Sequence, residues 1–402
     1  MHRRNEHIGP SAQTRLLHSA SGFAPERDET GPVNPGVVRA STLLARDVES
    51  FERLAPYATK GTATTKALEE ALLSISDGAG TCHLHPSGLA AIATVLLALT
   101  KADDHVLLSD ALYYPTRRLM KQLLSRHGVT ASFFDPRAET EAIITQMREN
   151  TSVLFLESPG SDSMEVLDIP ALAQAARERG IVPVIDDTWS AGWLFDPFGA
   201  GCLVSVQALT KYQCGHADVL MGAVLCARDA GDALAAAVAE RIAATHQTLG
   251  QCASGDDAWL MLRGLRTMPL RLQRHGESAL KIAHWLQGRP EVAAVLHPAL
   301  PGAVGHEFFA RDFSGASGLF SFVLKPEHDD DAVSAMLDGL ELFGLGASWG
   351  GYESLIMRKN MRQIRSHPWP YEGWLIRLSI GLEEPEDLIA DLAAGFERLS
   401  CD

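Results

Sequence analysis

The central part of the chain alternates between two hydrophobic periodicities. From about residue 63 onward, segments with apolar residues at helical spacing alternate with short apolar runs typical of buried strands. Such repetition predicts a mostly parallel sheet with helices on both faces, because parallel strands need a crossover between them. The expected helices are 66–76, 87–100, 116–127, 140–150 and 170–179, and the expected strands are 81–85, the end of 102–109, 129–134, 152–156, 181–185, 203–211 and 219–226.

The pattern changes after residue 255. Strands and helices no longer alternate strictly there, which favours a smaller α+β domain. Residues 1–30 are polar and punctuated by proline and glycine, so we expect a mobile N-terminal arm, followed by an extended segment to about residue 62. The later elements are a long helical stretch at 256–287, strands at 292–296, 318–324 and 374–380, and helices at 330–340 and 385–399.

Bulk composition restricts the class of protein without identifying it. The chain has 402 residues, 46% of them apolar, which is enough for two globular domains. Its net charge of −15 argues against binding to nucleic acid or to anionic membranes, because phosphate groups would repel such a surface. The longest apolar stretch is too short to cross a bilayer, and the N-terminus lacks the apolar core of a secretory signal. Six cysteines without CxxC pairing favour free thiols and a cytoplasmic protein.

Two polar residues stand where predicted strands end. Asp186 closes one apolar run and Lys211 closes the next, so that both side chains can reach one pocket. Pyridoxal 5′-phosphate (PLP) chemistry needs such a pair. A lysine amine forms a Schiff base with the cofactor aldehyde, and an aspartate keeps the pyridine nitrogen protonated. Strand alternation places only one of Asp186 and Asp187 on the cofactor side.

Longer motifs surround this pair and resemble a known family. The segments 185–192 (IDDTWSAG) and 207–218 (QALTKYQCGHAD) are similar to the cofactor motifs of the PLP-dependent enzymes of cysteine and methionine metabolism. The resemblance runs from about residue 31 to 399 and is strongest to the bacterial cystathionine β-lyase branch. Motifs of that branch follow in order at 155–161 (FLESPGS), 297–302 (HPALPG), 318–324 (GLFSFVL), 348–355 (SWGGYESL) and 375–382 (LIRLSIGL).

The resemblance implies fold, domains and activity. The implied fold is type I of the PLP-dependent transferases (aspartate aminotransferase-like), a mixed, mostly parallel seven-stranded sheet with a smaller α+β C-terminal domain. With this resemblance, we expect 63–255 to form the PLP-binding domain and 256–402 the C-terminal domain. Residues 1–62 are expected to form a segment that contributes to a neighbouring subunit. The implied reaction is α,β-elimination from L-cystathionine to homocysteine, pyruvate and ammonia, in methionine biosynthesis. Relatives are tetramers built from dimers, so we expect a homotetramer acting on a small amino acid.

The motif positions also imply roles at the cofactor ring. Lys211 is expected to bind the cofactor and then to remove the substrate Cα proton. The family motif selects Asp186 over Asp187 as the pyridinium partner. Tyr113 matches the tyrosine that stacks on the ring, with Tyr114 as a neighbouring alternative. Either Tyr113 or Lys211 would supply the proton that the leaving group takes.

A phosphate site is expected where a predicted helix begins. The backbone amides of Gly88 and Leu89 match the family's phosphate-binding amides, and helix N-termini favour anions. Thr210 would add a hydroxyl donor. Many relatives carry a serine three residues before the lysine; here Ala208 stands at that position, so one donor is missing.

The segment around Tyr57 departs from the family pattern. Relatives have an arginine two residues after this tyrosine, which reaches the phosphate in the neighbouring subunit. Here that position is Thr59, and Lys60 follows it. Our hypothesis is that Lys60 substitutes as a point charge, without the bidentate fork of arginine, and that Tyr57 still enters the partner's site.

The substrate is expected to meet residues of the C-terminal part. Arg377 lies within an apolar strand, and the family position favours a clamp on the substrate α-carboxylate over an internal ion pair. Ser348 and Trp349 would lie beside that carboxylate. Relatives acting at Cγ usually carry leucine and asparagine where this chain has Trp349 and Ser161, which favours the β-lyase pattern.

Alternatives stay open at this point. A related enzyme could act on another S-substituted cysteine, or at Cγ as a cystathionine lyase or synthase. A PLP-binding regulatory protein is the alternative from another class, and the intact set of Lys211, Asp186 and Arg377 argues against it. The histidines show no metal-ligand spacing, so no metal site is predicted.

Overall fold

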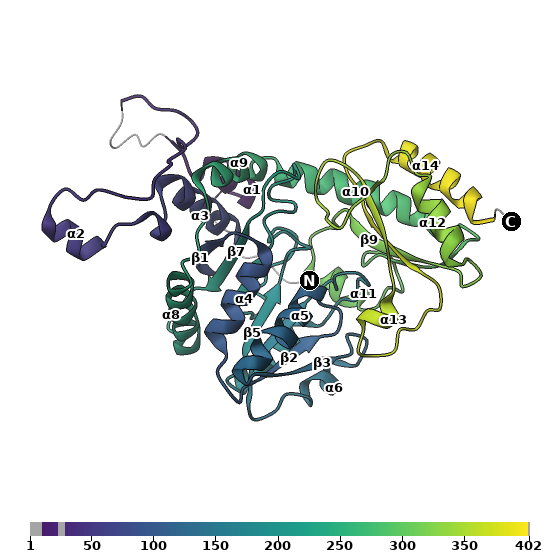
Figure 1. Cartoon of the computed structure of the whole chain (residues 1–402), viewed down its shortest axis with the longest axis horizontal. Helices are drawn as coiled ribbons and strands as arrows, with labels where there is room; N and C mark the ends of the chain where they lie inside the picture. The colour runs from purple at the N-terminus through teal and green to yellow at the C-terminus, as the bar shows by residue number, and fades with distance from the viewer. Residues whose placement is uncertain (1–9, 23–28, 401–402) are drawn as a thin grey trace.

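The structure is a computed structural model, and it describes residues 10–22 and 29–400. Its larger part is built on a seven-stranded sheet of order β1-β7-β6-β5-β4-β2-β3, seen at the centre of Figure 1. Strand β7 runs antiparallel to β1 and β6, and the other neighbours are parallel. The strands are β1 (Ala79–His85), β2 (His105–Ser109), β3 (Thr130–Phe134), β4 (Thr151–Glu157), β5 (Val182–Asp186), β6 (Val204–Gln207) and β7 (Gly222–Ala227).

Alternating side chains divide this sheet between two layers of helices. In β4, Val153 and Phe155 belong to one apolar cluster, whereas Leu154 and Leu156 belong to another. A strand buried on both faces needs no polar positions, which explains the continuous apolar runs in the sequence. One face is covered by α4 (Gly88–Leu99), α5 (Tyr114–Gln122) and α8 (Ala233–Thr248), and the other by α6 (Thr140–Ile144) and α7 (Ile169–Glu178). Helix α3 (Ala63–Ile75) packs against β1, and α9 (Gly255–Leu265) packs against α3. The short helix η2 (Leu124–His127) follows α5.

A second sheet, of order β10-β11-β12-β9-β8, lies in the C-terminal part. Phe320 and Phe322 pair across the strands with Leu378 and Ile376, and all four pack against the helices α10, α12 and α14. Arg377 therefore points to the opposite face of this sheet. The elements are α10 (Met268–Gln287), β8 (Val292–Leu296), α11 (His306–Asp312), β9 (Leu319–Leu324), α12 (Asp330–Asp338), β10 (Gly344–Leu345), β11 (Leu355–Lys359), α13 (Met361–Ile364), β12 (Leu375–Ser379), α14 (Pro385–Glu397) and η3 (Arg398–Ser400).

The N-terminal part contains α1 (Ala12–His18), α2 (Val48–Leu54) and η1 (Ala58–Lys60). Leu16 of α1 is fully buried, and the Arg15 side chain donates to the carbonyl of Ser74 at the end of α3 at 2.9 Å. The expectation of a mobile arm over 1–30 is therefore wrong for α1, while 1–9 and 23–28 lie outside the described residues. Helix α2 buries none of its residues, and Figure 1 shows it on a segment that extends away from the rest of the chain.

A segment of the C-terminal part around Ser366 and His367, called the strap here, is fixed to the large sheet by one buried carboxylate. Asp110, directly after β2, accepts backbone N–H bonds from Ser366 at 3.0 Å and His367 at 2.9 Å, and it pairs with Arg117 at 2.5 Å. Burial acts to raise the pKa of Asp110, but these donors together hold it below its ordinary value. Because Asp110 precedes Tyr113 by three residues, the strap ties the small sheet to the region of the predicted site.

The predicted fold is confirmed, and its differences from the structure are local. The helical stretch expected over 256–287 is two helices, α9 and α10, separated at Arg266 and Thr267. Helix α8 is absent from the sequence expectations because its many alanines give little contrast between apolar and polar positions. The divisions near residues 62 and 255 stay a prediction. Among the described residues, no helix is both long enough and apolar enough to cross a membrane.

We expect Asp110→Ala to lower the free energy of unfolding by roughly 3 kcal/mol, because it leaves buried N–H donors without an acceptor and the Arg117 guanidinium without its carboxylate. Urea denaturation of the variant measures this loss. Asp77→Ala is the matched control, since Asp77 is 66% exposed in its ion pair with Arg15, and such pairs contribute only about 0–1 kcal/mol. Equal losses in the two variants would contradict the assigned role of Asp110.

Candidate active site

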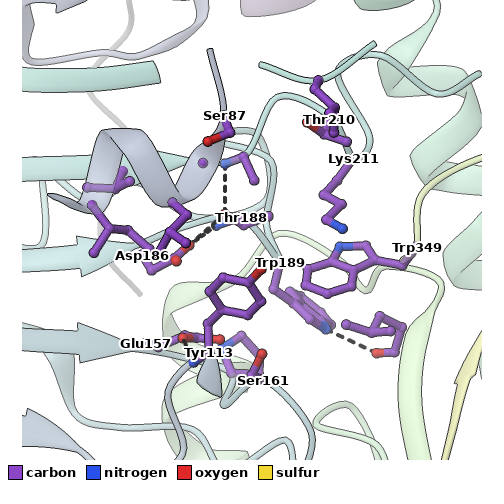
Figure 2. Close-up of a pocket in the computed structure, with 18 residues that line it drawn as sticks. Ser87, Tyr113, Glu157, Ser161, Asp186, Thr188, Trp189, Thr210, Lys211 and Trp349 are labelled. Atoms are coloured by element: carbon purple, nitrogen blue, oxygen red, sulfur yellow. Dashed lines mark hydrogen bonds between the residues drawn. The ribbon is translucent and has the colours of Figure 1, made fainter. Parts of the chain in front are cut away.

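A pocket opens at the edge of the large sheet where β4, β5 and β6 end (Figure 2). It encloses about 760 Å³ of empty space, part of it open to solvent. Its walls come from both sheets, because Leu319 and Trp349 of the C-terminal part complete a lining that is otherwise made by the large sheet and its loops. The lining residues are Ser87, Gly88, Leu89, Ile92, Tyr113, Glu157, Pro159, Ser161, Asp186, Thr188, Trp189, Val206, Ala208, Thr210, Lys211, Leu220, Leu319 and Trp349.

Two carboxyl groups lie side by side on the floor of this pocket. Glu157 and Asp186 are register partners at the ends of β4 and β5, and both residues are buried. Burial raises the pKa of both groups, and Glu157 is raised further by the charge of Asp186. Asp186 Oδ1 accepts hydrogen bonds from the hydroxyl of Thr188 at 2.5 Å and its N–H at 3.1 Å, which favour the charged form. The pKa of Glu157 is thus raised more strongly than that of Asp186, and Asp186 is the more easily charged of the two.

Lys211 enters the pocket from the loop that follows β6 (Figure 2). Its Nζ donates to the hydroxyl of Ser348 at 2.8 Å and lies 4.2 Å from the centroid of the Trp349 ring. Burial, and next the positive charge of Arg377, lower the pKa of Lys211 to about 8, although Asp186 acts in the opposite direction. The amine therefore loses its proton far more readily than that of an exposed lysine.

Tyr113 stands at the start of α5, and Figure 2 shows its ring in the pocket between Asp186 and Ser161. Its backbone N–H donates to Glu157 Oε2 at 2.6 Å, which fixes the turn that carries the ring. Burial raises the pKa of the Tyr113 hydroxyl, and the charges of Asp186 and Glu157 add to the effect. The hydroxyl thus keeps its proton at neutral pH and can act as a donor.

The start of α4 forms the other end of the pocket. Ser87 caps this helix by accepting the N–H of Ala90 at 3.1 Å, which leaves the N–H groups of the first turn directed outward. A Cβ at Gly88 would lie 2.6 Å from the Cβ of Ala208, so glycine permits the close approach of this turn to the loop before Lys211. The hydroxyl of Thr210 donates to the carbonyl of Met221 at 3.2 Å.

Arg377 lies beside the pocket but is not among its lining side chains. Its guanidinium is 5.3 Å from the centroid of the Trp349 ring, and its Nη1 donates to Asp162 Oδ1 at 2.9 Å. Its Nη2 contacts the sulfur of Met357 at 3.0 Å. The structure therefore brings Arg377 together with Trp349 and Lys211 as the sequence suggests, and it adds an internal ion pair. A guanidinium has five N–H donors, so Asp162 leaves others for a ligand.

The segment from Tyr57 to Lys60 does not contribute to this pocket. Tyr57 is 51% exposed, and its backbone forms an isolated bridge with Thr42. Thr59 and Lys60 lie in η1, which follows α2 and precedes α3 along the chain. Within the single chain, the predicted roles of Tyr57 and Lys60 therefore stay predictions.

Three residues of the site carry no role in the sequence analysis. Glu157 ends a buried strand as Asp186 does, so the same strand-end signal points to it. Thr188 lies two residues after Asp186, where a hydroxyl commonly caps a carboxylate. Asp162 sits in a loop, and only the folded chain reveals its two cationic neighbours.

The donor set fits PLP. Asp186 forms no ion pair within the part of the chain that the structure describes, so a protonated ring nitrogen would match its buried charge. The start of α4 offers N–H groups suited to a phosphate, and Lys211 offers an amine suited to an aldehyde. The indole Nε1 of Trp349 is buried without a hydrogen-bond partner, which leaves a further donor in the pocket wall.

Comparison with known proteins decides the family. A family described as "Cys/Met metabolism PLP-dependent enzyme" matches residues 13–397. The chain belongs to this family. Its members' dependence on PLP and the fold seen here confirm the expected cofactor and architecture.

Relatives with assigned activities span nearly the whole chain. Cystathionine beta-lyase MetC of Escherichia coli is 43% identical over 92% of this chain and 94% of its own length. An L-alanine/L-glutamate racemase of Wolbachia pipientis is 35% identical over 93% of this chain and 94% of its own. The crystal structure of cystathionine gamma-lyase from Lactobacillus plantarum complexed with L-serine has a TM-score of 0.88 at 27% identity, covering 98% of this chain and all of that one.

We expect the rate at which PLP combines with the cofactor-free protein to rise with pH, with a midpoint near 8, because the pKa of Lys211 is lowered to about 8 and only the neutral amine attacks. Stopped-flow absorbance of the bound cofactor measures the rate, and Lys211→Ala is the control that should form no adduct. A midpoint near 10.5, the ordinary value for lysine, would contradict the assigned environment.

Proposed function

We propose that this chain is a PLP-dependent carbon–sulfur lyase that catalyses α,β-elimination from L-cystathionine, giving homocysteine, pyruvate and ammonia. The observation that carries the proposal is one pocket that holds both a lysine amine of lowered pKa, Lys211, and a buried carboxylate, Asp186. Identities of 40–43% to cystathionine beta-lyases from four bacteria support the choice of substrate.

The cofactor would be held by residues at both ends of the pocket. The amides of Gly88 and Leu89 would bind the phosphate, Asp186 would bind the ring nitrogen, and Tyr113 would lie against the ring. Thr210 is a weaker candidate for the phosphate, because its hydroxyl already donates to a backbone carbonyl. When bound, PLP supplies a ring that accepts the electron pair released at the substrate Cα.

The remaining chemistry falls to side chains of the pocket. Lys211 removes the Cα proton, and its neutral form is accessible because burial lowers its pKa. The bond between Cβ and sulfur then breaks, and the sulfur takes a proton from Tyr113 or Lys211. The three-carbon fragment takes up water and loses ammonia to give pyruvate. Arg377 binds the α-carboxylate with Ser348 and Trp349 beside it, which holds the Cα–H bond in a reactive orientation.

We propose that the active assembly is a cytoplasmic homotetramer in which Tyr57 and Lys60 complete the site of a neighbouring subunit. The support is the position of the segment: α2 buries none of its residues, and Leu44, Val48 and Phe51 are mostly exposed. Apolar side chains on an extended segment are suited to a second copy of the chain. Lys60 would place a positive charge near the partner's phosphate.

Incubation with L-cystathionine should yield pyruvate, homocysteine and ammonia in equal amounts, and Lys211→Ala should remove this activity, since no other amine in the pocket can act as the base. Separate chromatographic analysis of 2-oxobutanoate and cysteine tests the alternative, because elimination at Cγ gives those products. Incubation with L-alanine and analysis of D-alanine tests the activity named for the Wolbachia relative. Predominant 2-oxobutanoate, or racemisation without elimination, would refute the proposed reaction.

Mixing Lys211→Ala with Tyr57→Ala subunits should restore activity, although each variant alone is inactive. In a mixed dimer, one of the two sites combines an intact lysine with an intact tyrosine from its neighbour, so random exchange recovers about one quarter of the wild-type sites. The measurement is pyruvate formation after subunits are exchanged in mild denaturant. Lys211→Ala mixed with Lys211→Ser is the control that should stay inactive, and no recovery in the test mixture would show that sites are not shared.

A further inference from the structure

The ion pair of Arg377 is part of a three-residue cluster with an uneven charge. Asp162 Oδ1 accepts from Arg377 at 2.9 Å, and its Oδ2 lies 3.6 Å from Nζ of Lys359. The side chains of Arg377 and Asp162 are 6% and 8% exposed, and that of Lys359 is 21% exposed. Two cations thus share one carboxylate, which leaves the cluster with one net positive charge.

The cluster lies beside other charged groups: Arg377 acts on the pKa of Lys211, and Asp162 acts on that of Glu157. The neighbouring Arg365 is paired with Glu165, and its side chain is also buried. Arg358, next to Lys359 on β11, turns toward helix α12, where it donates to Ser334. Counted by ion pairs alone, Arg377, Asp162 and Lys359 keep one positive charge in excess.

This arrangement matters because a buried arginine that is fully matched by a carboxylate offers little attraction to a second one. Without Lys359, Asp162 would neutralise Arg377, and a substrate carboxylate would approach a neutral pair. With Lys359 present, Asp162 has a second cation as partner, so Arg377 can direct some of its N–H donors to the ligand. Asp162 also anchors the cluster, since its backbone carbonyl accepts from Ser321 on β9 at 2.6 Å.

We propose that Lys359 acts through Asp162 to set the affinity of Arg377 for the α-carboxylate of the substrate. Lys359 is a positioning and charge-balancing residue in this role and does not touch the reacting atoms. The inference rests on the proposed function only in that the ligand is an α-amino acid bound by Arg377. It is independent of which bond the enzyme breaks.

The test compares a carboxylate with its uncharged analogue. L-Alanine and L-alaninamide are titrated into the holoenzyme, and binding is followed through the absorbance of the bound cofactor, so that turnover of cystathionine is not needed. Lys359→Met should weaken binding of L-alanine roughly tenfold and leave L-alaninamide nearly unchanged, because only the acid depends on the charge of the cluster. Lys121→Met, which removes an exposed lysine on α5, should change neither ligand.

A double variant separates charge from structure. Lys359→Met with Asp162→Asn again leaves one net positive charge, so it should recover most of the affinity for L-alanine. Unchanged binding of L-alanine in Lys359→Met, or equal loss of both ligands, would overturn the proposal. So would failure of the double variant to recover, since a purely structural role of Lys359 would not be rescued by removing its partner's charge. If cystathionine is not the substrate, these binding results still stand.

Discussion

A pair of buried carboxyl groups at the ends of β4 and β5 is the constraint on which the site depends. Strands buried on both faces place Asp186 and Glu157 side by side where water has little access, and two adjacent carboxylates cannot both stay charged there. Thr188 favours the charged form of Asp186, while burial and the neighbouring Asp186 raise the pKa of Glu157, which accepts the N–H of Tyr113. A cationic ring nitrogen would pair with Asp186. The family's cofactor would thus offset the cost of burying that carboxylate.

Buried ion pairs also join the two parts of the chain across their interface. The large sheet and its loops supply the carboxylates Asp110, Asp162 and Glu165, and the C-terminal part supplies Arg365 and Arg377. Asp110 contacts the C-terminal strap through the backbone N–H groups of Ser366 and His367, whereas Asp162 and Glu165 contact arginine side chains. Because these partners are buried, each contact requires the two parts to be correctly aligned. The contacts that join the two parts also place Arg377.

The sequence predicted those parts of the fold and site that depend on local pattern. Apolar runs located the strands of the large sheet, and strand ends located Asp186 and Lys211, because in a parallel sheet such ends share one edge. The pairing of Asp162 with Arg377 joins residues that are 215 positions apart, and no periodicity records a contact of that kind. Helix α8 was missed because its many alanines give little contrast between apolar and polar positions. The helix break before α10 was missed because the apolar spacing continues through it.

The charge cluster also links substrate binding to the strength of the base. The positive charge of Arg377 is, after burial, the largest cause that lowers the pKa of Lys211. In the proposed binding mode, a substrate carboxylate on Arg377 would offset that charge, so the pKa of Lys211 would rise toward that of an ordinary lysine. The amine is thus easier to deprotonate in the free enzyme, where the proposed function has it attack the cofactor. It would become more basic with substrate bound, where the same proposal has it accept the Cα proton. One arginine can serve both needs because it shares the single carboxylate of Asp162 with Lys359.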